Sequence, residues 1–142
     1  MNEFLVDTNI ASELFRPSPH PGVADWMKRQ DRNSLFMSVV NLGELRKGLT
    51  ILAPSHRRDQ LKEWLETGLI PWFGNRILPV TQPIAERWGA LDGQRQLAGR
   101  PLDTADGLIA ATALEHNLTL VTRNTKDFAG LGVKLLNPWD QA

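Results

Sequence analysis

The chain has 142 residues, 42% of them hydrophobic, which is enough to bury one core but not two, so we expect one domain over residues 1–142. The 16 basic and 16 acidic residues balance, which argues against a generic nucleic-acid binder, and the absence of cysteine excludes disulfides and thiolate metal ligands. No apolar run approaches the roughly 20 residues that span a bilayer, so we expect a cytoplasmic protein with no membrane partner.

Short apolar runs alternate with helical patterns along the whole chain. In chain order they predict a strand at residues 4–6, helices at 10–15 and 23–29, a strand at 35–37, a helix at 40–52 and a helix from the cap Ser55 to about residue 69. They then predict a strand at 77–78, a helix that Thr81 opens and that ends at 97, a helix at 104–116, and strands at 120–121 and 133–136. Residues 94–103 are the segment that we expect to be most mobile.

This alternation predicts an α/β fold, a single α/β/α sandwich with a mainly parallel central sheet. Ligands of such folds bind outside the carboxyl ends of the strands. Polar residues that follow the strands, or that begin the next helices, should therefore meet in one crevice.

Two aspartates stand at such positions. Asp7 follows the first strand directly, and Asp106 is the third residue of a helix for which Asp103 can be the N-cap. Each also has a structural explanation, because Asp7 can form an Asx turn with Thr8 and Asn9 and the two later acids can serve the helix dipole. Two acids at one helix end are more than capping requires, which favours a functional role for Asp106.

Glu44 lies opposite the leucine stripe of the helix predicted at residues 40–52, where a solvated glutamate is the ordinary interpretation. Asn41 and Gly48 flank it on the same side. This face is therefore predicted to be polar and sterically open, so that a substrate can approach it.

The segment at residues 120–127 repeats the pattern of a strand that ends in polar residues. Asn124 and Asp127 are spaced as the cap and the third position of a short helix, and capping alone can account for them. Together with the earlier acids, however, they place an acid or an amide at the carboxyl end of successive α/β units. That recurrence favours a shared site over coincidence.

Carboxylates that are brought together repel and raise one another's pKa unless a positive charge lies among them. Mg²⁺ or Mn²⁺ is the natural partner in a chain without cysteine, because these hard ions prefer oxygen ligands. Such a site suits phosphodiester hydrolysis, in which the ion acidifies a water and neutralises the phosphate.

Four motifs follow one another along the chain. They are Phe-Leu-Val-Asp-Thr-Asn at residues 4–9, Asn-Leu-Gly-Glu-Leu-Arg-Lys-Gly at 41–48, Thr-Ala-Asp-Gly-Leu-Ile-Ala-Ala-Thr-Ala at 104–113, and Leu-Val-Thr-Arg-Asn-Thr-Lys-Asp-Phe at 120–128. In this order they resemble the motifs of the PIN-domain ribonucleases, and closely those of the VapC and FitB type of toxin from bacterial toxin–antitoxin pairs. The closing Asn-Pro-Trp at 137–139 is similar to that of the FitB-like branch, and the resemblance covers essentially the whole chain.

The resemblance implies a compact α/β/α fold, an endoribonuclease that depends on Mg²⁺ or Mn²⁺, a homodimer, and neutralisation by a cognate small DNA-binding antitoxin. It also implies that Asp7, Glu44 and Asp106 hold the metal. Some relatives have a fourth acid at the position of Asn124 and others at that of Asp127. Either Asp127 is the fourth catalytic acid here, or the Asn124 amide completes the shell with water.

The resemblance further implies that Thr8 and Thr122 are hydroxyl groups that support the acids. The candidate RNA contacts are cations within a few residues of a proposed ligand, because guanidinium and ammonium groups pair with phosphate. They are Arg46, Lys47, Arg100 and Arg123. Each of them can equally be a solvated surface side chain.

Two alternatives to an active ribonuclease are open. A phosphoryl-transfer domain of the haloacid-dehalogenase or receiver kind also uses an aspartate after a strand, but Asn9 stands where such phosphatases need a second aspartate. The other alternative is a catalytically weak PIN-fold interaction module that binds an antitoxin or RNA without cleavage. Asn124 is the feature that encourages this second alternative.

Overall fold

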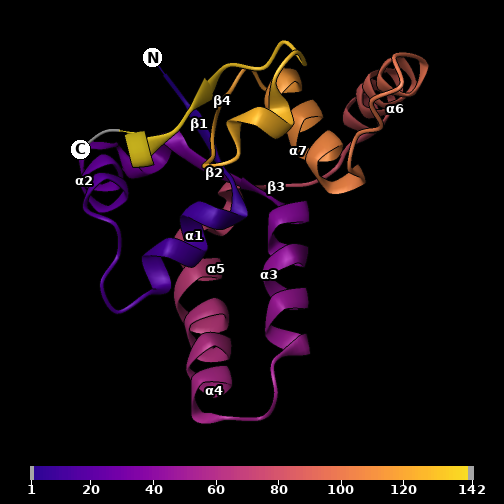
Figure 1. The fold of residues 1–142 in the computed structure, drawn as a ribbon. Coiled ribbons are helices and arrows are strands. Elements are labelled where there is room, and N and C mark those ends of the chain that lie inside the picture. The colour runs from indigo at the N-terminus through magenta and orange to yellow at the C-terminus, as the bar shows by residue number, and fades with distance from the viewer. Residues whose placement is uncertain (1, 141–142) are drawn as a thin grey trace.

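The computed structural model describes residues 2–140, in which strands and helices alternate (Figure 1). The strands are β1 (Phe4–Val6), β2 (Leu35–Ser38), β3 (Ile77–Leu78), β4 (Thr119–Val121) and β5 (Leu135–Leu136). The helices are α1 (Thr8–Phe15), α2 (Pro21–Arg29), α3 (Val39–Ile51), α4 (His56–Glu63), α5 (Ile70–Phe73), α6 (Gln82–Leu97) and α7 (Thr104–Glu115). Shorter helical segments are η1 (Arg32–Ser34), the π-helical η2 (Trp64–Leu69), η3 (Gly74–Arg76), η4 (Thr125–Phe128) and η5 (Pro138–Asp140).

The five strands form one sheet in the order β3-β2-β1-β4-β5, and every neighbouring pair is parallel. The central strand β1 sets the register, because Phe4 is opposite both Leu35 of β2 and Thr119 of β4. All carboxyl ends therefore lie at the same edge of the sheet. The predicted α/β class with a parallel central sheet is confirmed.

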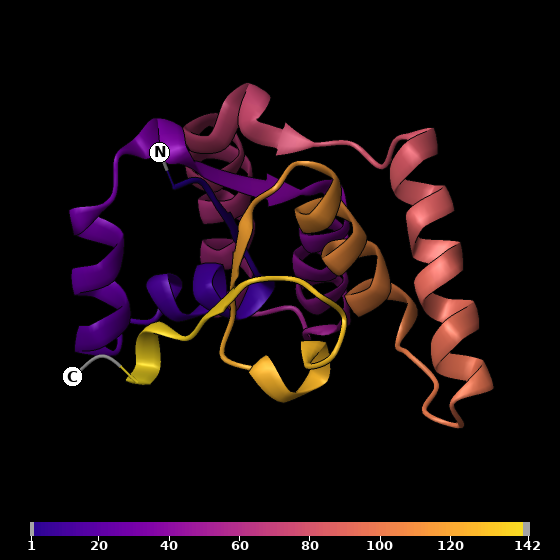
Figure 2. The same ribbon diagram turned by 90° about the horizontal axis from the view of Figure 1, so that it is seen from above.

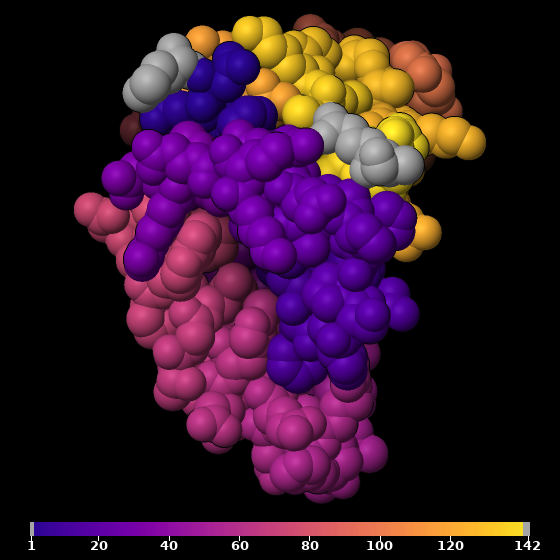
Figure 3. Space-filling model, turned by 90° about the vertical axis from the view of Figure 1, so that its left-hand side faces the viewer, coloured from indigo at the N-terminus to yellow at the C-terminus, as the bar shows by residue number. Residues whose placement is uncertain are grey.

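Helices cover both faces of the sheet, and the alternation of side chains along the strands decides what each face contacts. Phe4 and Val6 pack in one core with α1, α2, η2 and α5, whereas Leu5 packs in a second core with α7 and η4. Figure 2 shows α6 at the outer edge of the molecule, against α7. Figure 3 shows α2 in purple beneath the indigo N-terminal residues and the yellow segment around η5, which contacts α2.

The helix that follows Ser55 is longer than predicted. It was expected to end near residue 69, but it continues through η2 and α5 to Phe73 despite Pro71. Leu65, Leu69 and Phe73 recur every four residues and are all buried against the sheet. Burial of this apolar stripe therefore outweighs the helix-breaking tendency of the proline.

The predicted end of the helix at residue 97 is confirmed, so residues 94–97 of the segment expected to be mobile are helical. The last strand was expected at residues 133–136 but is limited to Leu135–Leu136. The chain turns at Gly130 and Gly132, whose φ angles are positive, and its bonding to β4 begins where the Leu120 N–H donates to the Lys134 carbonyl. Within residues 2–140 no helix is long and apolar enough to cross a membrane.

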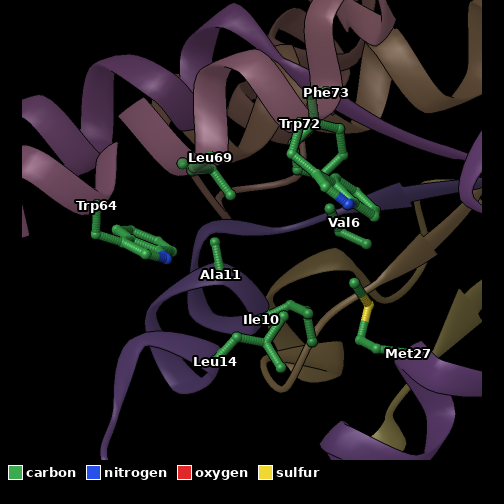
Figure 4. Close-up of a pocket in the computed structure, with 10 residues that line it drawn as sticks. Val6, Ile10, Ala11, Leu14, Met27, Trp64, Leu69, Trp72 and Phe73 are labelled. Carbon is green, nitrogen blue, oxygen red and sulfur yellow. The ribbon is translucent and has the colours of Figure 1, made fainter. Parts of the chain in front are cut away.

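An apolar pocket of about 320 Å³ lies between α1, α2 and the η2–α5 segment (Figure 4). In Figure 4, Leu69 and Trp72 on one side face Ala11, Ile10 and Met27 on the other. No charged side chain lines this pocket.

The contact between α6 and α7 depends on a glycine. A Cβ atom at Gly107 would lie 2.7 Å from Cδ1 and 2.9 Å from Nε1 of Trp88. We predict that Gly107→Ala lowers the free energy of unfolding by about 1–2 kcal/mol in chemical denaturation, because overpacking outweighs the better helix propensity of alanine. The control is Gly93→Ala on α6, where a Cβ meets nothing within 4 Å and should stabilise the protein by up to about 1 kcal/mol. A Gly107→Ala protein at least as stable as the wild type would contradict the packing described.

Candidate active site

A cleft of about 410 Å³ opens where the carboxyl ends of β1 and β4 meet helices α1, α3 and α7. Asp7, Glu44 and Asp106, which are far apart in the sequence, all line it. The other lining residues are Thr8, Asn9, Ser12, Glu13, Arg16, Arg123, Asn124 and Trp139. The crevice predicted from the order of strands and helices is therefore present in the fold.

Asp7 is the buried centre of this cleft. It ends β1 and caps α1, where its Oδ1 accepts a hydrogen bond of 2.8 Å from the Thr8 backbone N–H. Thr122 Oγ1 donates to Oδ2 at 2.8 Å, and Asn41 Nδ2 donates to Oδ1 at 3.1 Å. Burial raises the pKa of Asp7 although these donors oppose the rise. The three donors hold the carboxylate in one orientation.

Glu44 projects from α3 towards the start of α1. The Thr8 hydroxyl donates a hydrogen bond of 2.6 Å to Glu44 Oε1, and Asn41 Nδ2 donates to the Thr8 hydroxyl at 3.1 Å. Burial is the main cause that raises the pKa of Glu44, and the charge of Asp7 adds to it. Thr8 therefore links the two acids by hydrogen bonds.

Asn41 was expected on an open, polar face of its helix, and this prediction was wrong. Its side chain is fully buried, and its Oδ1 accepts a hydrogen bond from the Ser38 backbone N–H in a capping box at the start of α3. The same side chain donates to Asp7 and Thr8. One asparagine thus ties the start of α3 to the centre of the cleft.

Asp106 and Asp103 have separate roles at the start of α7. Asp103 caps the helix, because its Oδ2 accepts the Asp106 backbone N–H at 3.2 Å, whereas the Asp106 side chain lines the cleft. Burial, followed by the charges of Asp103 and Asp7, raises the pKa of Asp106 to about 7. Asp127 and Glu44 add smaller contributions of the same sign. The charges of Asp103, Asp7, Asp127 and Glu44 therefore all raise the pKa of Asp106.

The segment after β4 supports the cleft through Thr122. The Asn124 backbone N–H donates to Thr122 Oγ1 at 3.0 Å, while this hydroxyl donates to Asp7. Asn124 precedes η4 as predicted and lines the cleft, but its side chain makes no capping hydrogen bond. Asp127 is the third residue of η4, and its charge raises the pKa of both Asp7 and Asp106.

The four predicted RNA contacts are distributed unequally around the cleft. Arg123 lines it, with its guanidinium 5.2 Å from the centre of the Trp139 ring. Arg46 instead forms an ion pair of 3.2 Å with Glu66. Lys47 lines a neighbouring hollow between α3 and α7, and Arg100 lies in the loop after α6 and is absent from the cleft lining.

Arg16 lines the cleft and was missed in the sequence. Glu13 is buried, and its side chain accepts a hydrogen bond of 2.9 Å from the His20 backbone N–H. It also forms an ion pair of 3.3 Å with Arg16. The His20 N–H is the main cause that lowers the pKa of Glu13. The available signal was the three-residue spacing of Glu13 on α1 and Arg16, which directly follows α1, but this spacing is also typical of an exposed helix pair.

The donor atoms of the cleft fit a hard divalent cation. Among residues 2–140 no three acidic or histidine side chains lie close enough together to hold an ion alone, and none of Asp7, Glu44 and Asp106 forms an ion pair within this range. Mg²⁺ keeps several waters and takes only one or two carboxylates directly, and the cleft has room for those waters. Burial is the first cause of the raised pKa of each of these three acids, and the charges of neighbouring acids add to it; a cation in the cleft would oppose both effects.

Comparison with known proteins identifies the family. The PIN domain family matches residues 4–134. The chain is 36% identical to toxin FitB of Neisseria gonorrhoeae, over 95% of this chain and 97% of that protein, and 33% identical to VapC ribonuclease Y4jK of Sinorhizobium fredii, over 97% and 99%. A solved structure of FitAB bound to an IR36 DNA fragment contains a chain with a TM-score of 0.88 and 34% identity, with 96% of this chain and 95% of that chain covered. The chain therefore belongs to the PIN domain family, and it is similar to the FitB and VapC proteins over nearly its whole length.

The charge cluster predicts a pH-dependent stability. The Asp106 carboxyl binds its proton more tightly in the folded than in the unfolded protein, so the free energy of unfolding should fall as the pH rises from about 4 to about 7. Asp106→Asn has no proton to lose. In EDTA it should stabilise the protein by about 1–2 kcal/mol at about pH 8, after allowance for solvent screening at this half-exposed group, and hardly at all at about pH 5.

Thermal unfolding across this pH range checks the result, with Asp25→Asn on the exposed side of α2 as the control for the loss of one charge. A stabilisation by Asp106→Asn that does not change with pH, or that is matched by the control, would contradict the cluster.

Proposed function

We propose that the chain is a metal-dependent endoribonuclease and the toxin of a toxin–antitoxin pair. The observation that carries this proposal is the convergence of Asp7, Glu44 and Asp106 on one cleft at the carboxyl edge of a parallel sheet. Its similarity to proteins named toxin FitB and VapC ribonuclease supports it.

Asp7, Glu44 and Asp106 would hold Mg²⁺ or Mn²⁺. When bound, the ion supplies an acidified water and neutralises the phosphate that is attacked. The protein's own contribution is orientation: Thr122 and Asn41 direct the Asp7 carboxylate, and the Thr8 hydroxyl directs Glu44.

Two residues are the alternatives for the fourth position of the site. Asn124 lines the cleft, where its amide oxygen can complete the shell together with water. Asp127 adds negative charge at Asp106 and so favours a cation nearby. Arg123 and Arg16, on the cleft wall, would bind the phosphates of the RNA on either side of the bond that is cut.

The partners proposed are RNA, a cognate small DNA-binding antitoxin and a second copy of the chain. The FitAB assembly bound to DNA supports the antitoxin, and the uncharged pocket of Figure 4 suits an apolar protein segment better than RNA. Ile51 at the end of α3 and Leu97 at the end of α6 are 75% and 91% exposed, which suits contact with a second copy.

RNA cleavage with purified protein tests this proposal. We expect cleavage in Mn²⁺ that stops in EDTA, and a rate at least about 100-fold lower for Asp7→Asn and Asp106→Asn, because each removes a charged ligand. Asp25→Asn, on the exposed side of α2, should cleave at the rate of the wild type. Undiminished cleavage in EDTA, or by either cleft variant, would reject the mechanism. Metal binding without any cleavage would instead favour the interaction module.

A further inference from the structure

Three hollows meet at Glu44. It lines the catalytic cleft, a hollow between α3 and α7, and a groove of about 240 Å³ between α1 and α3 that we call the α1–α3 groove. The lining of this groove consists of Thr8, Ser12, Phe15, Glu44, Leu45, Gly48, Leu49, Leu52, Arg57 and Leu61. The groove therefore shares Thr8, Ser12 and Glu44 with the catalytic cleft and leads away from it.

The spacing of these residues gives the groove a direction. Thr8, Ser12 and Phe15 lie on one face of α1, and residues 44, 48 and 52 lie on one face of α3. Figure 1 shows α1 and α3 side by side, with α4 at their lower end. Leu52, the C-cap residue that ends α3, is eight positions after Glu44, so the groove extends about 12 Å along the helix from the acids towards α4.

The walls of the groove combine apolar surface with one cation at the far end. Arg57 lies over the Phe15 ring at 5.4 Å, and this ring contacts Trp64 at 5.1 Å between centroids. Arg57 forms no ion pair with an acid among residues 2–140. A Cβ at Gly48 would meet nothing within 4 Å, so the α3 wall is open in the middle of the groove. The α1–α3 groove is thus largely apolar, lies next to the proposed phosphate-binding cleft, and ends at the Arg57 guanidinium, which has no acidic partner among residues 2–140. Such a groove suits a nucleic-acid base followed by a phosphate.

We propose that the α1–α3 groove binds a nucleotide of single-stranded RNA beside the bond that is cut, with the base between α1 and α3 and the next phosphate on Arg57. The proposal rests on the proposed ribonuclease function. Continuity with the carboxylates and the single cation at the end favour RNA over a protein segment, for which the uncharged pocket of Figure 4 is better suited. The groove would then select which nucleotide lies next to the cleavage site.

The first test separates the phosphate contact from general charge. Binding of a short fluorescent single-stranded RNA is measured by anisotropy in EDTA, so that it is not cut, over a range of salt concentrations. Arg57→Ala should weaken binding about 5- to 10-fold and reduce the salt dependence by about 0.7, the value for one phosphate contact on a single strand. Lys62→Ala, an exposed cation of α4 outside the groove lining, is the matched control and should change neither quantity.

The second test blocks the space for the base without a change of charge. Gly48→Leu fills the groove, and we expect RNA binding about 5- to 10-fold weaker with the same salt dependence. Gly43→Leu is the matched control, because Gly43 is equally open on α3 and lines the α3–α7 hollow as Gly48 does, but it does not line the α1–α3 groove. It should bind RNA as the wild type does.

Equal effects of Arg57→Ala and Lys62→Ala, or of Gly48→Leu and Gly43→Leu, would overturn the groove proposal. So would a result in which Arg57→Ala and Gly48→Leu bind RNA normally but fail to bind the antitoxin, because the groove would then belong to a protein partner. A wild-type protein that cleaves RNA in Mn²⁺ while all four variants match it rejects the groove alone. A wild-type protein that neither binds nor cleaves RNA rejects both proposals.

Discussion

Burial of carboxylates in one cleft, together with their mutual repulsion, is the constraint on which the site depends. Asp7 is buried, which makes its charged form less stable, and the charge of Asp127 adds to this effect. The fold opposes this effect with hydrogen-bond donors to Asp7. One is Thr122, which follows β4 and accepts a hydrogen bond from the Asn124 backbone N–H, and another is Asn41 of α3. Neutral donors orient a carboxylate but do not cancel its charge. A cation that enters the cleft removes the repulsion, and the binding of metal and of phosphate should therefore be coupled.

The parallel sheet makes this arrangement possible and also made much of it predictable. Short apolar runs identified the strands, and helical apolar patterns identified the principal helices. The rule that ligands bind at carboxyl ends then pointed to Asp7 and Asp106. Glu44 was a weaker prediction, because a glutamate opposite a leucine stripe is ordinarily solvated. The tertiary contact with Thr8 distinguishes it from a surface residue, and no local pattern contains that contact.

Contacts between distant elements account for what the sequence did not predict. Asn41 was expected to flank an open face but is buried, because its side-chain amide donates a hydrogen bond to Asp7, which is 34 residues away in the sequence. The cation Arg46 turned out to pair with Glu66, whereas Arg57, in a different helix, closes the groove that starts at the acids. Sequence spacing places residues on a helix face, but it does not specify which other helix that face meets.

The cleft, the groove and the apolar pocket give the protein three surfaces of different chemistry, namely acidic, mixed and uncharged. Under the proposed function, the apolar pocket shares no lining residue with the other two surfaces, so a protein partner there would not compete with RNA for the same side chains. The most direct measurement of the central claim is an anomalous difference map from crystals grown with Mn²⁺. The account predicts a peak between Asp7, Glu44 and Asp106; a map whose manganese peaks all lie away from these three carboxylates would contradict it.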